Sequence, residues 1–219
     1  MNQIWTYFTA NQSQIWRWTW TTVWLAGLPL VAGVIVSLPI GWMASRVGWL
    51  YPPVVAASGL LYTIPSLALF LTLPAVLNTS IISPVNVAVA LGIYTVALMV
   101  RVVADGLNSV SAETMAAASA MGYTNRQRLF NVQLPIAVPV IGAGLRVAAV
   151  SNVSLVSVAS IVGVSQLGSL FLDGSINSTN VPVAIGLVFV IVLALVFDNA
   201  ILLGVRLLTP WQRAAAARS

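Results

Sequence analysis

The chain has 219 residues, of which 59% are hydrophobic and only 6% are charged, and its nine basic and four acidic residues give a net charge of +5. A soluble domain carries about 25% charged residues, so this composition excludes an ordinary soluble fold and predicts a polytopic membrane protein. The sequence has no cysteine and no histidine, which excludes disulfide frameworks, thiolate chemistry, histidine-based metal sites and Ser-His triads.

Five apolar stretches are each long enough to cross a bilayer as a helix, which takes about 20 residues. They lie at about 20–45, 54–76, 85–103, 136–164 and 181–208. None shows the two-residue alternation of a barrel strand. The sequence therefore predicts a single all-α transmembrane domain, residues 1–219, with about five membrane-spanning helices. Prolines inside these stretches predict kinks, at Pro29, Pro39, Pro65, Pro74 and Pro139.

The arginines predict how the chain is oriented in the membrane. They fall in the first and third connections and near the C-terminus, whereas the connections at 77–84 and 165–180 have none; the residues are Arg46, Arg126, Arg128, Arg206, Arg213 and Arg218. The positive-inside rule then places the N-terminus outside and the C-terminus in the cytoplasm. Because these arginines form no stripe on one face, nucleic acid is not an expected partner; membrane lipid is.

The longest connection, residues 104–134, lies on the predicted cytoplasmic side. Residues 112–121, AETMAAASAM, are strong helix formers, with Ser111 as a candidate cap and Gly122 as the stop. Thr124 or Asn125 is expected to begin a second short helix that Pro135 ends. Two alternatives remain open from these residues: the pair of helices docks into a groove on a partner, or it lies on lipid.

Residues 116–135, AAASAMGYTNRQRLFNVQLP, resemble the EAA loop of ATP-binding cassette importer permeases. The family pattern is Glu-Ala-Ala, three residues, Gly, nine residues, and then Ile-x-Leu-Pro or a close variant. The positions in register are Ala117, Ala118, Gly122, Val132, Leu134 and Pro135. The glutamate position is occupied by Ala116, which removes one acidic contact from the loop.

The segments around this loop resemble the glycine betaine, carnitine and choline branch of these permeases. They are TIPSLALF (63–70), VALMVRVVADGL (96–107), PVIGAGLR (139–146) and IVGVSQLGSLFLDGSI (161–176). The family has Gly-Ala-Gly-Gly-Leu-Gly where this chain has GVSQLG. The resemblance covers residues 20–210 and implies a type I importer permease fold in the cell membrane.

The resemblance also implies partners. These are a cytoplasmic ATPase dimer, an extracytoplasmic substrate-binding protein, and a second permease copy or a related permease. The chain has no GxxxxGK[ST] phosphate loop, so ATP and Mg are expected on the partner ATPase, with no cofactor or metal on this chain and no enzymatic activity of its own. The residues expected to couple to the ATPase are Ala116, Ala117, Ala118, Gly122, Arg126, Arg128, Leu134 and Pro135.

A possible polar site inside the membrane comprises Asp198, in the last apolar stretch, and Arg101, at the end of the third. An acid within a span is costly and marks a functional site by default. Two explanations would account for Asp198. It forms a structural pair with Arg206 or Arg101, or it contacts the substrate. Arg101 and Arg146 are expected to reach the inner interface.

Aromatic cages commonly hold quaternary ammonium ligands. The aromatic residues near the spans are Trp42, Tyr62, Phe70 and Tyr94, and their spacing assembles no cage. The resemblance places such a cage on the binding protein.

The expected function is the membrane permease of an importer for a small osmoprotectant of the glycine betaine, choline, carnitine or proline type, working by alternating access. One alternative keeps the fold and changes the cargo to methionine, ergothioneine or another amino-acid derivative. Alternatives of a different class are a self-contained channel or secondary transporter, for which inverted repeats are expected, and a membrane scaffold without transport.

Overall fold

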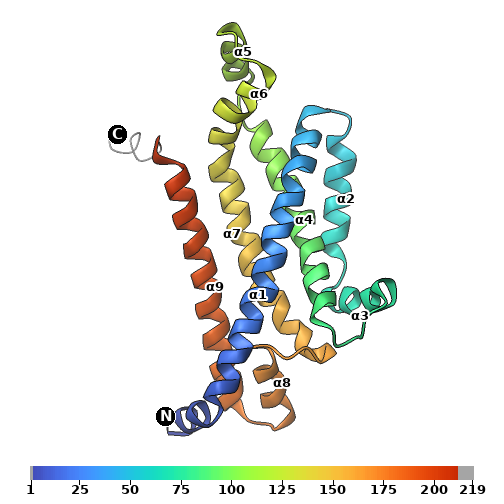
Figure 1. Cartoon of the computed structure of the whole chain (residues 1–219), viewed down its shortest axis with the longest axis vertical. Coiled ribbons are helices and arrows are strands. Elements are labelled where there is room, and N and C mark those ends of the chain that lie inside the picture. The colour runs from blue at the N-terminus through green and yellow to red at the C-terminus, as the bar shows by residue number, and fades with distance from the viewer. Residues whose placement is uncertain (1, 212–219) are drawn as a thin grey trace.

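The computed structural model describes residues 2–211, which form helices and turns without any strand (Figure 1). The helices are α1 Asn2–Arg46, α2 Tyr51–Thr63, α3 Ser66–Leu77, α4 Pro84–Asn108, α5 Ala112–Ala120, α6 Asn125–Arg128, α7 Leu134–Val158, α8 Ser169–Ile176 and α9 Asn180–Leu208. A π-helical turn, Leu129–Gln133, precedes α7, and a 3-10 turn, Ala159–Val162, follows it. Arg213 and Arg218, which contributed to the predicted orientation, lie outside the described residues.

Within the described residues, four helical segments are long and apolar enough to cross a membrane: Gln3–Arg46, Pro84–Asn108, Asn125–Val162 and Asn180–Leu208. This confirms the all-α membrane fold. Helix α1 begins well before the predicted residue 20, and its 45 residues span about 68 Å, more than twice the hydrocarbon thickness. Its first turns therefore extend beyond the bilayer and bend aside at the end of the bundle (Figure 1).

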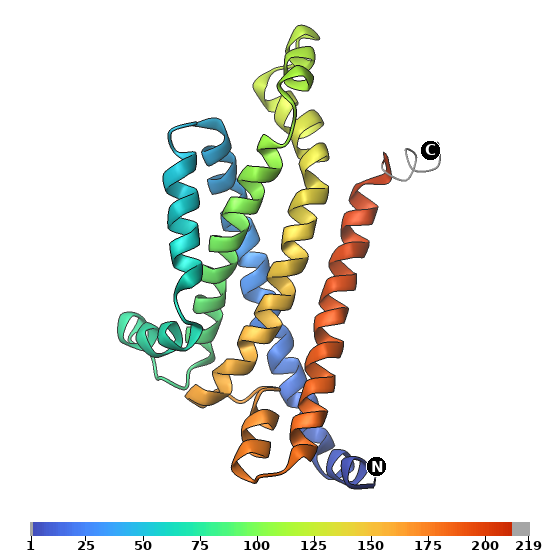
Figure 2. The same cartoon turned by 180° about the vertical axis from the view of Figure 1, so that it is seen from behind.

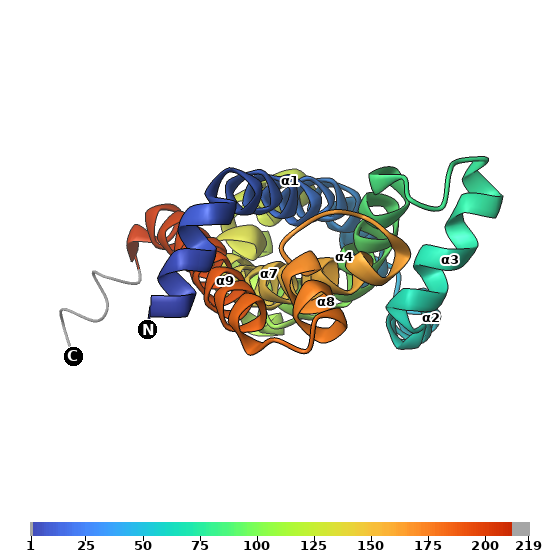
Figure 3. The same cartoon turned by 90° about the horizontal axis from the view of Figure 1, so that it is seen from below.

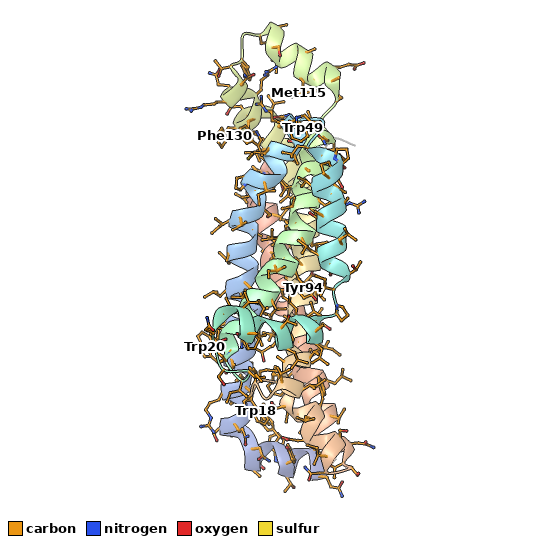
Figure 4. All side chains as sticks on the ribbon, turned by 90° about the vertical axis from the view of Figure 1, so that its right-hand side faces the viewer. Trp18, Trp20, Trp49, Tyr94, Met115 and Phe130 are labelled. Carbon is orange, nitrogen blue, oxygen red and sulfur yellow. The ribbon has the colours of Figure 1, made fainter. Side chains whose placement is uncertain are left out.

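The second predicted span is not one helix. Helices α2 and α3 meet at an angle of 98°, and α3 lies across the bundle (Figures 2 and 4). The cause is local, because Ile64 precedes Pro65 and a residue before proline is pushed out of the helical region; Ile64 has a ψ of 129° and Pro65 of 130°. The hydroxyl of Tyr94 on α4 donates a hydrogen bond to the freed carbonyl of Ile64.

The prediction that Pro135 ends the loop helix is wrong. Helix α6, the π-helical turn and α7 form one continuous helical segment, Asn125–Val162. Proline lacks the N–H of a regular helix and crowds the preceding turn. The wider turn at Leu129–Gln133, where the N–H of Leu134 bonds to the carbonyl of Leu129, accommodates Pro135 without a break. The other prolines at 29, 39, 74 and 139 lie inside helices that continue past them.

Helices α4 and α7 lie at the centre of the bundle. Viewed along its axis, α2 and α3 stand at one edge and α9 at the other, with α1 along one face (Figure 3). Glycines let α1 approach α4 closely: a Cβ added to Gly33 would lie 2.5 Å from Cγ2 of Thr95, and one added to Gly41 would lie 2.7 Å from Cβ of Val103. Small residues of this kind drive helix packing in lipid, where no hydrophobic effect operates between helices.

The two ends of the bundle differ in charge. The end of α1 with Arg46, the α5–α6 segment with Arg126 and Arg128, and the end of α9 lie at one end, whereas the start of α1 and α8 lie at the other (Figures 1 and 2). Trp49 lies near the first end, and Trp18 and Trp20 lie toward the second (Figure 4), as expected for indoles at the two interfaces. The arrangement agrees with a cytoplasmic α5–α6 segment.

A buried polar contact joins three helices. The Asn152 amide on α7 donates to the Thr95 hydroxyl on α4 at 3.0 Å and to the Ala26 carbonyl on α1 at 3.3 Å. Both polar side chains are buried. In a membrane such a contact is worth about 1 kcal/mol, and it sets the relative position of the helices.

We expect Asn152→Ala to lower the free energy of unfolding in detergent by about 1 kcal/mol, because the Thr95 hydroxyl and the Ala26 carbonyl lose their common partner. Asn199→Ala is the matched control, since the Asn199 side chain is exposed and bonds only within its own helix, to the carbonyl of Leu195. Denaturant titration followed by circular dichroism measures both. Equal stability of the two variants would contradict a joining role for Asn152.

Candidate functional site

The α5–α6 segment projects beyond the bundle at its cytoplasmic end (Figures 1 and 4). The hydroxyl of Ser111 accepts a hydrogen bond from the N–H of Thr114 at 3.2 Å and so caps α5. Gly122 has a φ of +82°, the left-handed conformation that glycine adopts without strain. The Thr124 N–H and the Gln127 side chain complete a capping box at 2.8 Å. The short helix α5 and the glycine turn are thus confirmed, whereas α6 begins where predicted but continues into α7.

Two arginines hold this segment together. Arg128 donates to the Ser119 hydroxyl on α5 at 2.6 Å and to the side chain of Asn125 on α6. Arg46, at the end of α1, donates to the Asn125 carbonyl at 3.3 Å. Arg128 therefore bonds within the loop, while the exposed Arg126 remains the candidate contact for a partner or for lipid phosphate.

The remaining predicted coupling residues differ in exposure. Ala118 is buried, whereas Ala116, Ala117 and Gly122 are exposed, and Leu134 and Pro135 are half-buried at the start of α7. No atom of the described residues lies within 4 Å of a Cβ added at Gly122. The structure therefore brings the α5 residues and the turn to one projecting surface and leaves Leu134 and Pro135 at its base.

Three large apolar side chains are also exposed on this projection: Met121 at 67%, Tyr123 at 38% and Phe130 at 63%. The sequence reasoning missed Met121 and Tyr123, although their position at the turn beside Gly122 was a usable signal. A small-residue helix next to exposed apolar side chains suits docking into a protein groove. The projection away from the bundle favours this alternative over a helix lying flat on lipid.

The partner of Asp198 differs from those that the sequence suggested. Arg146 on α7 donates two hydrogen bonds to Asp198 on α9, from Nε to Oδ1 and from a terminal nitrogen to Oδ2, both at 2.7 Å. This is the bidentate geometry that makes arginine–carboxylate pairs strong. Arg146 lies opposite Asp198, eighteen residues into α9.

Arg101 belongs to a different cluster. Its Nε lies 3.5 Å from Asp105 one turn further along α4, and the Tyr51 hydroxyl at the start of α2 also donates to that carboxylate. Arg101 and Asp198 are thus not brought together, and the predicted polar site divides into an α7–α9 ion pair and an α2–α4 cluster.

A cavity of about 340 Å³ opens at the break between α2 and α3. Its lining residues come from α2, α3, α4 and α7: Tyr62, Ile64, Ser66, Tyr94, Val150, Ser151, Ser154 and Leu155. The Tyr62 and Tyr94 rings meet edge to face, with centroids 5.8 Å apart. No pattern in the sequence links these two tyrosines. Among the other aromatic residues near the spans, Phe70 is in the core and Trp42 contacts Arg46 at the cytoplasmic end.

The described residues thus form a bundle of helices long and apolar enough to cross a membrane, with a capped segment that projects at one end. A family described as "Binding-protein-dependent transport system inner membrane component" matches residues 30–207. The chain therefore belongs to this family of membrane permeases.

Curated relatives extend over most of the chain. The osmoprotectant import permease protein OsmW of Salmonella typhimurium is 33% identical over 194 residues, covering 88% of this chain and 90% of that protein. The glycine betaine/carnitine/choline transport system permease protein OpuCD of Bacillus subtilis is 29% identical over 180 residues, covering 82% and 77%.

Solved structures show the same fold. A chain of the MetNI methionine ABC transporter in an inward-facing conformation superposes with a TM-score of 0.81 at 22% identity, covering 90% of this chain and 97% of that chain. A chain of an amino acid ABC transporter gives a TM-score of 0.73 at 19% identity, covering 92% and 97%. At this identity the likeness establishes the ABC importer permease fold.

Proposed function

We propose that this chain is the permease subunit of an ATP-driven importer for a small osmoprotectant of the glycine betaine, choline, carnitine or proline type. The class of cargo is inferred from the 33% identity to an osmoprotectant import permease over nearly the full length of both chains. The transport class rests on the family match across residues 30–207.

In this proposal the energy comes from a partner ATPase dimer that binds ATP and Mg, since the chain itself has no phosphate-binding loop. The α5–α6 segment docks into that ATPase through the small residues of α5 and the exposed Met121, Tyr123 and Phe130. A substrate-binding protein delivers cargo at the opposite end of the bundle. A second copy of the chain, or a related permease, completes the pathway.

The continuous helix Asn125–Val162 provides a route for coupling. A movement of α6 is passed directly to α7, because no flexible connection separates them. Along α7, Arg146 is paired with α9 and Asn152 is bonded to α1 and α4. ATP-driven displacement of the docked segment therefore tilts α7 and the helices attached to it, which switches access from one side to the other.

The methionine alternative has weaker support. It rests on a fold likeness at 22% identity, whereas the quaternary-amine assignment rests on several relatives with named cargo. One fold can host many functions, so a likeness in fold alone indicates the cargo less reliably than a sequence relative does.

Uptake measurements test the proposal. The chain is expressed together with candidate ATPase and binding-protein subunits, in cells that lack their own betaine uptake. We expect accumulation of radiolabelled glycine betaine, choline or carnitine that requires the ATPase. Accumulation of methionine alone would overturn the cargo class, and equal accumulation without the ATPase would indicate a self-contained channel or secondary transporter.

A further inference from the structure

The cavity at the α2–α3 break has a polar wall inside the membrane-spanning part of the chain. Tyr94 lies ten residues into α4, about 15 Å from the outer end of that helix, and Figure 4 shows it midway along the bundle. Hydroxyl groups come from three other helices: Tyr62 on α2, Ser66 on α3, and Ser151 and Ser154 on α7. In the described part of the chain, no protein group bonds to any of these four hydroxyls.

The face that carries this cavity differs from the lipid-facing side of the bundle. The exposed face of α9 is wholly aliphatic over its central turns, with Leu187, Val188, Ile191, Val192, Leu195 and Val196. A polar group without a partner is costly in hydrocarbon. The unpartnered hydroxyls line a cavity between α2, α3, α4 and α7, and α2 and α3 lie at the edge of the bundle away from α9 (Figure 3). They therefore indicate a surface that faces water or cargo.

The chemistry of the cavity wall fits a small zwitterion with a quaternary ammonium group. The perpendicular rings of Tyr62 and Tyr94 offer aromatic surface to a cation, and the Tyr62 side chain is accessible at 40%. The serine hydroxyls can donate hydrogen bonds to a carboxylate. Among residues 2–211, no charged side chain lines the cavity, which suits a ligand whose own charges cancel and whose passage requires weak binding. The volume of about 340 Å³ holds a molecule of that size.

The tyrosine pair also connects this cavity to the hinge between α2 and α3. The Tyr94 hydroxyl donates to the Ile64 carbonyl at the break, which fixes its ring, and the Tyr62 ring meets that ring edge to face. A change of the angle between α2 and α3 would move Tyr62 relative to Tyr94. The two rings would then separate or approach each other at the cavity wall.

We infer that this cavity is a binding site for the quaternary ammonium cargo on the translocation path through the permease itself; the inference rests on the proposed function. Tyr62 contacts the cation, and Ser151 and Ser154 contact the anionic or hydroxyl end of the cargo.

Cysteine labelling tests the site without requiring transport. Because the chain has no cysteine, Ser154→Cys introduces its single thiol, with little change in size. The probe is a methanethiosulfonate that carries a trimethylammonium group, applied to membrane vesicles of both orientations containing the assembled transporter. We expect labelling that choline or glycine betaine slows severalfold and methionine does not. Val192→Cys, on the aliphatic face of α9, is the matched control and should remain unlabelled.

Failure to label Ser154→Cys, or labelling that neither quaternary amine slows, would overturn the site. A second set of variants addresses Tyr62. Tyr62→Leu should lower the maximal uptake of glycine betaine by roughly 3- to 30-fold, while Tyr62→Trp and Tyr62→Phe, which keep an aromatic face, should retain most of it. Normal uptake by Tyr62→Leu would overturn the site alone, whereas absent uptake by the unmodified chain with its partners would overturn the proposed function.

Discussion

Asp198→Ala is expected to destabilise the folded chain, because a charged side chain within a membrane span is costly without its partner. The substitution leaves the Arg146 guanidinium, which now donates two 2.7 Å bonds to Asp198, without a counter-charge. The measurement is the midpoint of thermal unfolding in detergent, together with the fraction of chain that inserts into membranes.

The matched control is the double variant Arg146→Met with Asp198→Leu. Replacing both partners of an ion pair by apolar residues is often neutral or stabilising, so the double variant should recover most of the stability lost in Asp198→Ala. If the double variant is as unstable as the single one, the ion pair is not what positions α7 against α9.

Gly122→Val is expected to reduce ATP-dependent uptake by more than tenfold while the chain still inserts. A β-branched residue strongly disfavours the left-handed conformation that Gly122 adopts at φ +82°. The turn between α5 and α6 must then open, and the docking surface loses its shape. The bundle itself is unaffected, because Gly122 is exposed and the part of the chain that the structure describes has no atom within 4 Å of the added Cβ.

Two controls separate backbone geometry from added bulk. Gly122→Asn should retain uptake, since asparagine tolerates the left-handed conformation. Gly48→Val, in the other cytoplasmic connection and equally free of close neighbours, should also be tolerated. Uptake is followed with labelled glycine betaine, and association with the ATPase by co-purification. Full uptake by Gly122→Val with normal ATPase association would contradict a coupling role for this turn.

Local features of the chain could be predicted in detail. Ser111, Gly122 and Thr124 act within three or four residues of their own position, so their side-chain chemistry alone indicated where α5 ends and α6 begins. The long apolar runs and the placement of arginine similarly determined the class of protein, the approximate number of crossings and the sidedness, because each depends on the bilayer rather than on other helices.

Pro65 and Pro135 show the limit of such local reasoning. Both remove a backbone donor, yet Pro65 lies at a 98° break whereas Pro135 lies inside a continuous helix. The difference lies in the surroundings: the Tyr94 hydroxyl satisfies the carbonyl freed at Ile64, and a π-helical turn widens the backbone before Pro135. Neither compensation is visible from the proline alone.

The sequence by itself determined that this is a helical membrane protein with a helical cytoplasmic segment, because composition, charge and caps are properties of neighbouring residues; its resemblance to the EAA loop indicated a permease. Only the tertiary structure decided that Asp198 pairs with Arg146 and that Tyr62 meets Tyr94 beside the serines of α7. Those partners are 52 and 32 positions apart in the chain and are brought together by the packing of α2, α4, α7 and α9, which no local pattern specifies.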